Sequence, residues 1–126
     1  MRSGFSIFTA SNMKDESKRP WGHYDILLES DTIKVKKIVV KPGKRLSYQS
    51  HKFRSENWVI AQGIATVTLD DVVYELKQND HIYIPQGSKH RVANEGDLNL
   101  VFIEVQSGSY FGEDDITRYE DDFNRV

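Results

Sequence analysis

Residues 43–63 read GKRLSYQSHKFRSENWVIAQG, and this stretch decides both the fold and the candidate site. Side chains alternate between the two faces of a strand, so one face of this segment is expected to carry Arg45, Ser47, Gln49 and His51. Four polar side chains on one face are typical of a solvated face or of the wall of a polar pocket. Alternation alone does not decide between these two interpretations.

A glutamate follows on the next expected strand. Glu56 shares its face with Trp58 and Ile60, so its carboxylate points inward if that face is the apolar interior. A lone buried carboxylate costs several kcal/mol unless it is paired or bound to a metal. Gln49 and His51, across the expected hairpin, are its natural partners.

A second group of polar and turn-forming residues lies further along the chain: Asn79, Pro85, Gly87, His90 and Asn94. The neutral imidazole is the commonest transition-metal ligand in proteins, although a single histidine in a β-protein is more often an ordinary hydrogen-bonded residue. Oxygens of Gln49 and Glu56, with nitrogens of His51 and His90, would suit Zn²⁺, Mn²⁺, Fe²⁺, Co²⁺ or Ni²⁺ and leave positions open for substrate. The joint spacing of the two groups therefore predicts a metal site.

Composition excludes several other classes of site and partner. The 126 residues are 38% hydrophobic and 29% charged, with a net charge of −2. Nothing in this balance indicates nucleic acid or a membrane as partner. Without cysteine, a metal must be held by nitrogen and oxygen ligands. The apolar stretch near the N-terminus is too short and too interrupted by polar residues for a signal peptide, so a cytoplasmic protein is expected.

The apolar pattern after residue 20 alternates with a period of two, interrupted by turn residues, and predicts short strands. The expected strands are Tyr24–Leu28, Ile33–Val40, Arg45–His51, Asn57–Ala61, Ala65–Leu69, Val72–Leu76, His81–Ile84, His90–Ala93 and Leu98–Val105. This pattern favours an all-β sandwich or barrel, with a tight hairpin at Asp70-Asp71. Residues 1–18 are expected to form an N-terminal arm and 19–126 a single domain, whose acidic tail holds one short helix.

Both polar groups match motifs of the cupin superfamily. The first motif, G-x5-H-x-H-x4-E-x6-G, is matched from Gly43 to Gly63, with Gln49 in place of the first histidine. The second, G-x5-P-x-G-x2-H-x3-N, is matched from Asn79 to Asn94, with Asn79 in place of the leading glycine. Asparagine tolerates the left-handed backbone conformation better than most residues. The resemblance implies an all-β double-stranded β-helix, a small jelly-roll barrel.

A closer resemblance covers nearly the whole chain. RPWGHYDIL near the N-terminus, YIPQGSKHRV and SGSYFGEDDITRYEDDFNR are similar to the type II mannose-6-phosphate isomerase domain, which is often fused behind a mannose-1-phosphate guanylyltransferase domain. This resemblance implies metal-dependent interconversion of mannose 6-phosphate and fructose 6-phosphate, feeding GDP-mannose and polysaccharide biosynthesis. Type I phosphomannose isomerases bind zinc through a similar set, which here implies Gln49, His51, Glu56 and His90 as ligands.

The chain also departs from the family pattern Q-x-H-H-H-R-x-E-H-W. Three of its histidines are replaced here, by Lys52, Phe53 and Asn57. A proton-transfer role for these histidines therefore does not carry over. No segment resembles the guanylyltransferase domain, so nucleotidyl transfer is not expected of this chain.

Several arginines are candidates for contacts with a sugar phosphate. Arg54 is expected either to face the pocket and stabilise an enediolate or to be a solvated hairpin residue. Arg45 and Ser47 are candidates for phosphate or sugar contacts, because arginine binds phosphate bidentately. Arg91 is equally well a structural ion-pair partner, and Arg118, in the acidic tail, is expected to lie on a solvated face.

Two other functions remain open from the sequence. One is a different sugar-modifying cupin, an isomerase or epimerase that works without metal, and the other is a metal-containing cupin that binds a sugar or sugar phosphate without turnover. Trp21, Trp58 and Tyr83 either line a sugar pocket or belong to the core and interfaces. Pairing of the N-terminal arm with a second subunit would give a homodimer.

Overall fold

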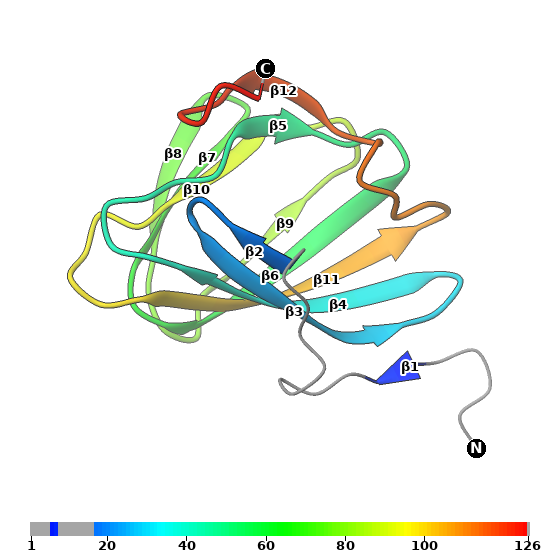
Figure 1. Cartoon of the computed structure of the whole chain (residues 1–126), viewed down its shortest axis with the longest axis horizontal. Helices are drawn as coiled ribbons and strands as arrows, with labels where there is room; N and C mark the ends of the chain where they lie inside the picture. The colour runs from blue at the N-terminus through cyan, green and yellow to red at the C-terminus, as the bar shows by residue number, and fades with distance from the viewer. Residues whose placement is uncertain (1–5, 8–16, 126) are drawn as a thin grey trace.

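The computed structural model describes residues 6–7 and 17–125, which form two antiparallel sheets facing each other (Figure 1). The seven-stranded sheet has the order β1-β3-β4-β11-β6-β9, with β2 also on β3. Its strands are β1 Ser6–Ile7, β2 Lys18–Arg19, β3 Gly22–Glu29, β4 Ile33–Val40, β6 Arg54–Gln62, β9 His81–Ile84 and β11 Leu100–Gly108. The five-stranded sheet has the order β12-β5-β10-β7-β8. Its strands are β5 Tyr48–Ser50, β7 Ala65–Leu69, β8 Val72–Leu76, β10 His90–Ala93 and β12 Thr117–Glu120.

The core lies between the two sheets and follows the period of two that the sequence shows. Along β6 the burial alternates strictly from Arg54 to Ile60, with every second side chain pointing inward. Phe102 on β11 is fully buried, and its ring lies 4.9 Å from that of Trp58. A fully buried apolar side chain such as Phe102 or Ile60 contributes about 1.5–3 kcal/mol through burial. The all-β prediction is confirmed.

The turns explain why both motifs require glycine at fixed places. Gly43, Gly63 and Gly87 have φ values of 78°, 83° and 81°, in the left-handed region that side chains disfavour. Asn79, which stands where the second motif has its leading glycine, has a φ of 76°. Asp70 and Asp71 also have positive φ, as the two-residue hairpin turn requires. The predictions for Asp70-Asp71 and for Asn79 are confirmed.

The segment before β5 differs from the prediction of a strand over Arg45–His51. Only Tyr48–Ser50 is a strand, and Arg45 makes one isolated bridge to Ala93. Side chains alternate strictly only along a continuous strand. The prediction that Arg45 shares a face with Gln49 assumed such a strand over Arg45–His51, and this assumption was wrong. The irregular backbone instead lets the neighbouring Leu46 and Ser47 both face the same cavity.

Both ends of the chain pair with sheet edges. The tail holds strand β12 on β5 and not the short helix that was predicted, because pairing satisfies backbone groups that an edge strand leaves open. At the other end, Ser6–Ile7 pairs with β3 of the same chain. Lys18, at the end of the predicted dimer-forming arm, also pairs with β3, and residues 1–5 and 8–16 lie outside the described residues. In residues 6–7 and 17–125, no helix is long and apolar enough to cross a membrane.

Candidate metal centre

Three side chains converge inside the fold: His51, Glu56 and His90, hereafter the triad. Glu56 points inward from β6, His90 begins β10, and His51 directly follows β5. One possible ligand atom from each residue lies within 4.8 Å of the other two. Nε2 of His51 is 3.3 Å from Oε2 of Glu56, and Nε2 of His90 is 3.9 Å from Oε1. All three side chains are buried, as the metal hypothesis requires.

Hydrogen bonds orient both imidazoles for metal binding. Nδ1 of His51 lies 2.8 Å from the carbonyl oxygen of Asp115, and Nδ1 of His90 lies 3.0 Å from that of Ser88. A carbonyl only accepts, so each Nδ1 carries a hydrogen, and Nε2 is the ring nitrogen left to face Glu56 and a metal. Burial lowers the pKa of His51 to about 4, so this ring is neutral at pH 7. The donor set therefore suits a divalent cation.

Gln49 lies beside the triad on β5. It pairs directly with His90 across the two strands, and directly paired residues share one face of a sheet. Gln49 also lines the cavity described below. With its amide oxygen, the group would offer two nitrogen and two oxygen donors, the set that the spacing predicted.

Asp115 supports the loop that carries His51. Its carboxylate accepts hydrogen bonds from the backbone N–H groups of Lys52 and Phe53, at 3.0 and 2.9 Å. Its own carbonyl fixes the His51 ring, as described above. Partners of this kind tune a metal site nearly as strongly as the ligands themselves. Sequence reasoning missed Asp115 because the acidic tail was interpreted as solvated.

Arg54 stands between the triad and the open cavity. Its Nε donates to Oε2 of Glu56 at 3.0 Å, and Nη2 donates to Nε2 of His51 at 3.1 Å. Burial pushes the pKa of Glu56 upward, but the His90 imidazole and the Arg54 guanidinium outweigh burial and lower this pKa. Glu56 is therefore a carboxylate at neutral pH, and the guanidinium contacts the same atoms that would hold a metal.

A cavity opens beside this arrangement. Arg54 and Gln49 form part of its wall, together with Trp21 and Ser47. The triad residues do not line it, but Arg54 is hydrogen-bonded to two of them. Of the fourteen residues that line the cavity, five are arginine or lysine and two are glutamate. An excess of positive charge favours an anionic ligand.

The three residues predicted to contact the substrate, Arg45, Ser47 and Arg91, lie in different environments. Ser47 is 2% exposed and lines the cavity. Arg45 is exposed, lies outside the lining, and binds Asp122 through two hydrogen bonds of 2.8 Å. Arg91 is buried and donates to the carbonyl of Leu46 and to Glu120. Of the three predicted substrate contacts, the structure thus brings only Ser47 to the cavity.

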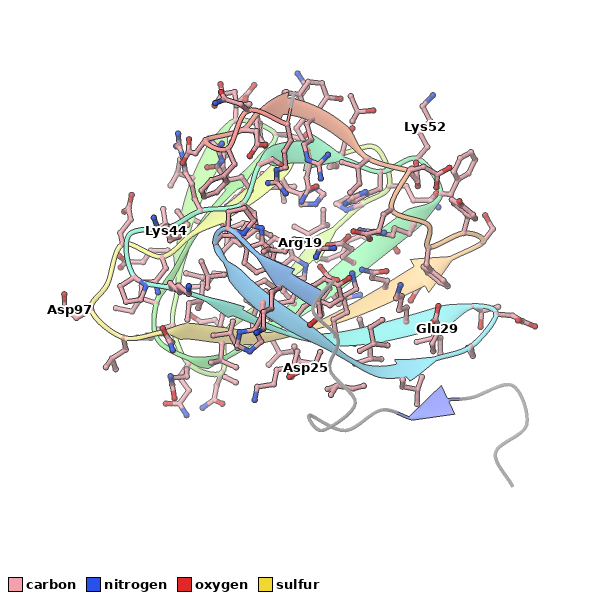
Figure 2. The ribbon with its side chains drawn as sticks, in the orientation of Figure 1. Arg19, Asp25, Glu29, Lys44, Lys52 and Asp97 are labelled. Atoms are coloured by element: carbon pink, nitrogen blue, oxygen red, sulfur yellow. The ribbon has the colours of Figure 1, made fainter. Side chains whose placement is uncertain are left out.

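The three positions that depart from the family pattern all lie on the surface. Lys52, Phe53 and Asn57 are exposed, and the Lys52 side chain points away from the body of the protein (Figure 2). None of them lines the cavity. Their replacement therefore removes no group from the cavity wall.

The three aromatic candidates have different environments. Trp58 is buried and donates from Nε1 to Oε1 of Glu56 at 2.9 Å, so it supports the triad. Trp21 belongs to the core and also lines the cavity. Tyr83 is 52% exposed and lies outside the lining. Of these three aromatic residues, only Trp21 therefore lines the cavity.

Glu104 is a second buried carboxyl group at the cavity, and sequence reasoning missed it. It lies on β11 opposite Trp58 and accepts a hydrogen bond from Nε2 of Gln106. Burial, followed by the charge of Glu56, raises the pKa of Glu104 to about 8. The alternation from Leu100 through Phe102 would have placed Glu104 inward, since side chains two apart share a face.

The raised pKa of Glu104 predicts a pH-dependent stability of the metal-free protein. Folding raises this pKa from 4.5 to about 8, so the folded state keeps a proton that the unfolded state has released. Between pH 6.5 and 8 the free energy of unfolding is expected to fall by about 1–2 kcal/mol as pH rises. Below pH 6.5 the lowered pKa of His51 makes the free energy of unfolding rise with pH, which opposes the effect of Glu104. The measurement therefore begins at pH 6.5.

Urea unfolding in the presence of a chelator measures this slope. Glu104→Gln, which cannot titrate, is expected to show little change across the same window. An equal slope in the variant and the original protein would contradict the assignment to Glu104.

Comparison with known proteins shows which family the chain belongs to. Residues 9–121 match the family model described as mannose-6-phosphate isomerase C-terminal. The chain belongs to this family. The alginate biosynthesis protein AlgA of Pseudomonas aeruginosa is 52% identical over 88% of the chain, and mannose-1-phosphate guanylyltransferase ManC of Salmonella typhimurium is 47% identical over 91%. The chain spans only 23% and 24% of these two relatives.

A solved structure identifies the fold of this mannose-6-phosphate isomerase C-terminal domain. An RmlC-like cupin from Shewanella frigidimarina matches with a TM-score of 0.71 at 17% identity, over 88% of this chain and 97% of that chain. A likeness at this identity speaks for the fold alone. The predicted cupin fold and family are confirmed.

Proposed function

We propose that the chain is a metal-dependent aldose–ketose isomerase that interconverts mannose 6-phosphate and fructose 6-phosphate. The observation that carries the proposal is the buried triad, which adjoins a cavity that is rich in basic side chains and is lined by Gln49 and Arg54. Family membership and relatives named for alginate and xanthan biosynthesis support this substrate class and a role in polysaccharide precursor supply. Zinc is our first choice of metal, with manganese, iron, cobalt and nickel as alternatives.

The reaction moves a proton between C1 and C2 and passes through an enediolate. A divalent metal held by the triad and Gln49 would supply electrophilic stabilisation of the negative charge that develops on the sugar oxygens. Arg54 lines the cavity, and its buried Nη1 has no hydrogen-bond partner among the described residues. This donor is positioned to stabilise the same negative charge, and Ser47 is positioned to contact a sugar hydroxyl.

The surface positions of Lys52, Phe53 and Asn57 support turnover. The departures from the family pattern leave the cavity wall and the triad intact. A site that lost its catalytic groups would be expected to show the losses among lining residues. A cytoplasmic location and a homodimer stay predictions.

A coupled assay that detects fructose 6-phosphate from mannose 6-phosphate tests the proposal. We expect turnover with zinc, manganese or cobalt, loss of turnover with a chelator, and recovery when the metal is restored. Binding of the sugar phosphate without turnover under all three metals would contradict the proposal and favour a non-enzymatic binder. Turnover of another sugar in metal-free protein would favour a different sugar-modifying cupin.

A further inference from the structure

Three neighbouring strands align a row of residues across one wall of the cavity. His90 on β10 pairs with Gln49 on β5, and Gln49 pairs with Arg118 on β12. Directly paired residues share a face, so all three side chains belong to the inner face of the five-stranded sheet. Gln49 and Arg118 both line the cavity. Arg118 is therefore in line with the proposed metal ligands, two strands away from His90.

The basic side chains of the cavity differ in how far their charge is already compensated. Arg19 and Lys36 both lie 3.7 Å from the carboxylate of Glu113. Arg125 makes two hydrogen bonds to the carboxylate of Asp121, at 2.6 and 3.0 Å. These three cations therefore have acidic partners within the protein.

Arg118 differs from them. Its Nε is buried and has no hydrogen-bond partner among the described residues. Burial, followed by the like charge of Arg125, lowers the pKa of Arg118. A buried guanidinium nitrogen without a partner is costly unless a ligand supplies the missing acceptor.

We propose that Arg118 binds the phosphate group of the substrate, at the end of the cavity opposite the triad. The proposal rests on the function proposed above, which makes the ligand a sugar phosphate. The planar guanidinium binds a phosphate monoester through two parallel hydrogen bonds. Arg125, held by Asp121, adds positive charge beside this contact.

The spacing along the row fits such a ligand. Neighbouring antiparallel strands place paired Cα atoms about 5 Å apart, so Arg118 and His90 are separated by roughly 10 Å at the backbone. In a hexose 6-phosphate, the phosphate is at the opposite end of the carbon chain from C1 and C2. One molecule can therefore place its reacting carbons near the triad and its phosphate at Arg118, with Gln49 between them.

The other two candidate arginines are occupied elsewhere. Arg45 binds Asp122 on the surface, and Arg91 binds Glu120 outside the cavity lining. Neither guanidinium reaches the cavity without breaking an existing ion pair. The sequence pattern favoured Arg45 and Arg91 for the contact with the phosphate. The structure favours Arg118, in the tail, instead.

Titration calorimetry on the metal-loaded protein tests this inference. Arg118→Met is expected to weaken mannose 6-phosphate binding by roughly 10- to 100-fold, the loss of one charged bidentate contact. The weak affinity for unphosphorylated mannose is expected to stay within about twofold, because only the phosphate contact is lost. Arg118→Lys keeps the charge without the planar fork, so an intermediate affinity is expected.

Two further variants and a folding control complete the design. Lys44→Met removes an exposed charge outside the cavity lining and is expected to leave affinity unchanged. Thermal unfolding and metal content of both Arg118 variants should match the original protein, since Nε of Arg118 has no hydrogen-bond partner in the described part of the chain. If Arg45→Met weakens sugar phosphate binding and Arg118→Met does not, the inference is overturned.

The outcomes separate this inference from the proposed function. A protein that binds mannose 6-phosphate through Arg118 but turns over none of it would refute the isomerase and support the anion contact. An active isomerase whose KM for mannose 6-phosphate is unchanged by Arg118→Met would support the isomerase and refute the anion contact. Equal losses of affinity for mannose and mannose 6-phosphate would also refute it, because they indicate a general distortion of the site.

Discussion

His51→Ala is expected to abolish metal binding and, with it, isomerase turnover. His51 is one of two imidazoles in the triad, and the Asp115 carbonyl at Nδ1 and Arg54 at Nε2 already hold its ring in place. Loss of a partner outside the ligand set lowers metal affinity by about 10- to 100-fold, so loss of a ligand should cost at least about 100-fold. Elemental analysis after dialysis against equimolar zinc measures the bound metal, and competition with a chelator measures its affinity.

His81→Ala provides the matched control for this experiment. His81 begins β9 and is exposed, so its loss removes an imidazole of the same chemistry from outside the triad. The control is expected to bind zinc with the original stoichiometry. Equimolar, tightly bound zinc in His51→Ala would exclude the triad as the metal site, and this result would stand whatever the activity of the protein.

The spacing of the two motifs made the triad predictable because each spacing reflects a backbone requirement. Gly43, Gly63 and Gly87 stand at turns with positive φ, and Asn79 meets the same requirement without being glycine. Fixed turns set the register of the strands between them, and the register decides which side chains point inward. A local pattern therefore contained enough information to bring His51, Glu56 and His90 together.

The remaining wall of the cavity was less predictable because distant segments build it. Arg118 reaches the inner face only because β12 adds to the edge of β5, a pairing that the acidic composition of the tail does not reveal. Asp115 acts through backbone groups of the His51 loop, 62 and 63 positions away in sequence. Arg45 was predicted to face the cavity and does not, because the backbone before β5 is irregular and side chains there do not alternate as in a strand.

The arrangement around Arg54 indicates that one guanidinium performs two tasks. Without a metal, it neutralises Glu56 and satisfies the lone pair of His51. A metal at the triad would need these same atoms, so the guanidinium and the metal compete for them. Once displaced, Arg54 would still line the cavity, and its charge would be available for the contact with the sugar that we propose. Removing Arg54 should therefore affect the metal-free and metal-bound proteins differently.

Arg54→Met is expected to destabilise the metal-free protein by about 3–5 kcal/mol, the usual cost of leaving one partner of a buried ion pair alone. With zinc bound, the loss should be much smaller, because the metal then compensates the charge of Glu56. The increase in stability that zinc produces should consequently be larger in Arg54→Met than in the original protein. Urea unfolding with and without zinc measures both quantities.

Arg91→Met is the matched control, because Arg91 is also buried and ion-paired. Its partner Glu120 has a side chain that is 65% exposed, so water can solvate the carboxylate once the arginine is gone. The control should therefore lose less stability, and zinc should stabilise it by the same amount as the original protein. If Arg54→Met instead lost equal stability with and without zinc, its guanidinium and the metal would not be sharing the carboxylate of Glu56. Arg54 would then be a structural counterion, and the enediolate contact assigned to it would lose its physical basis.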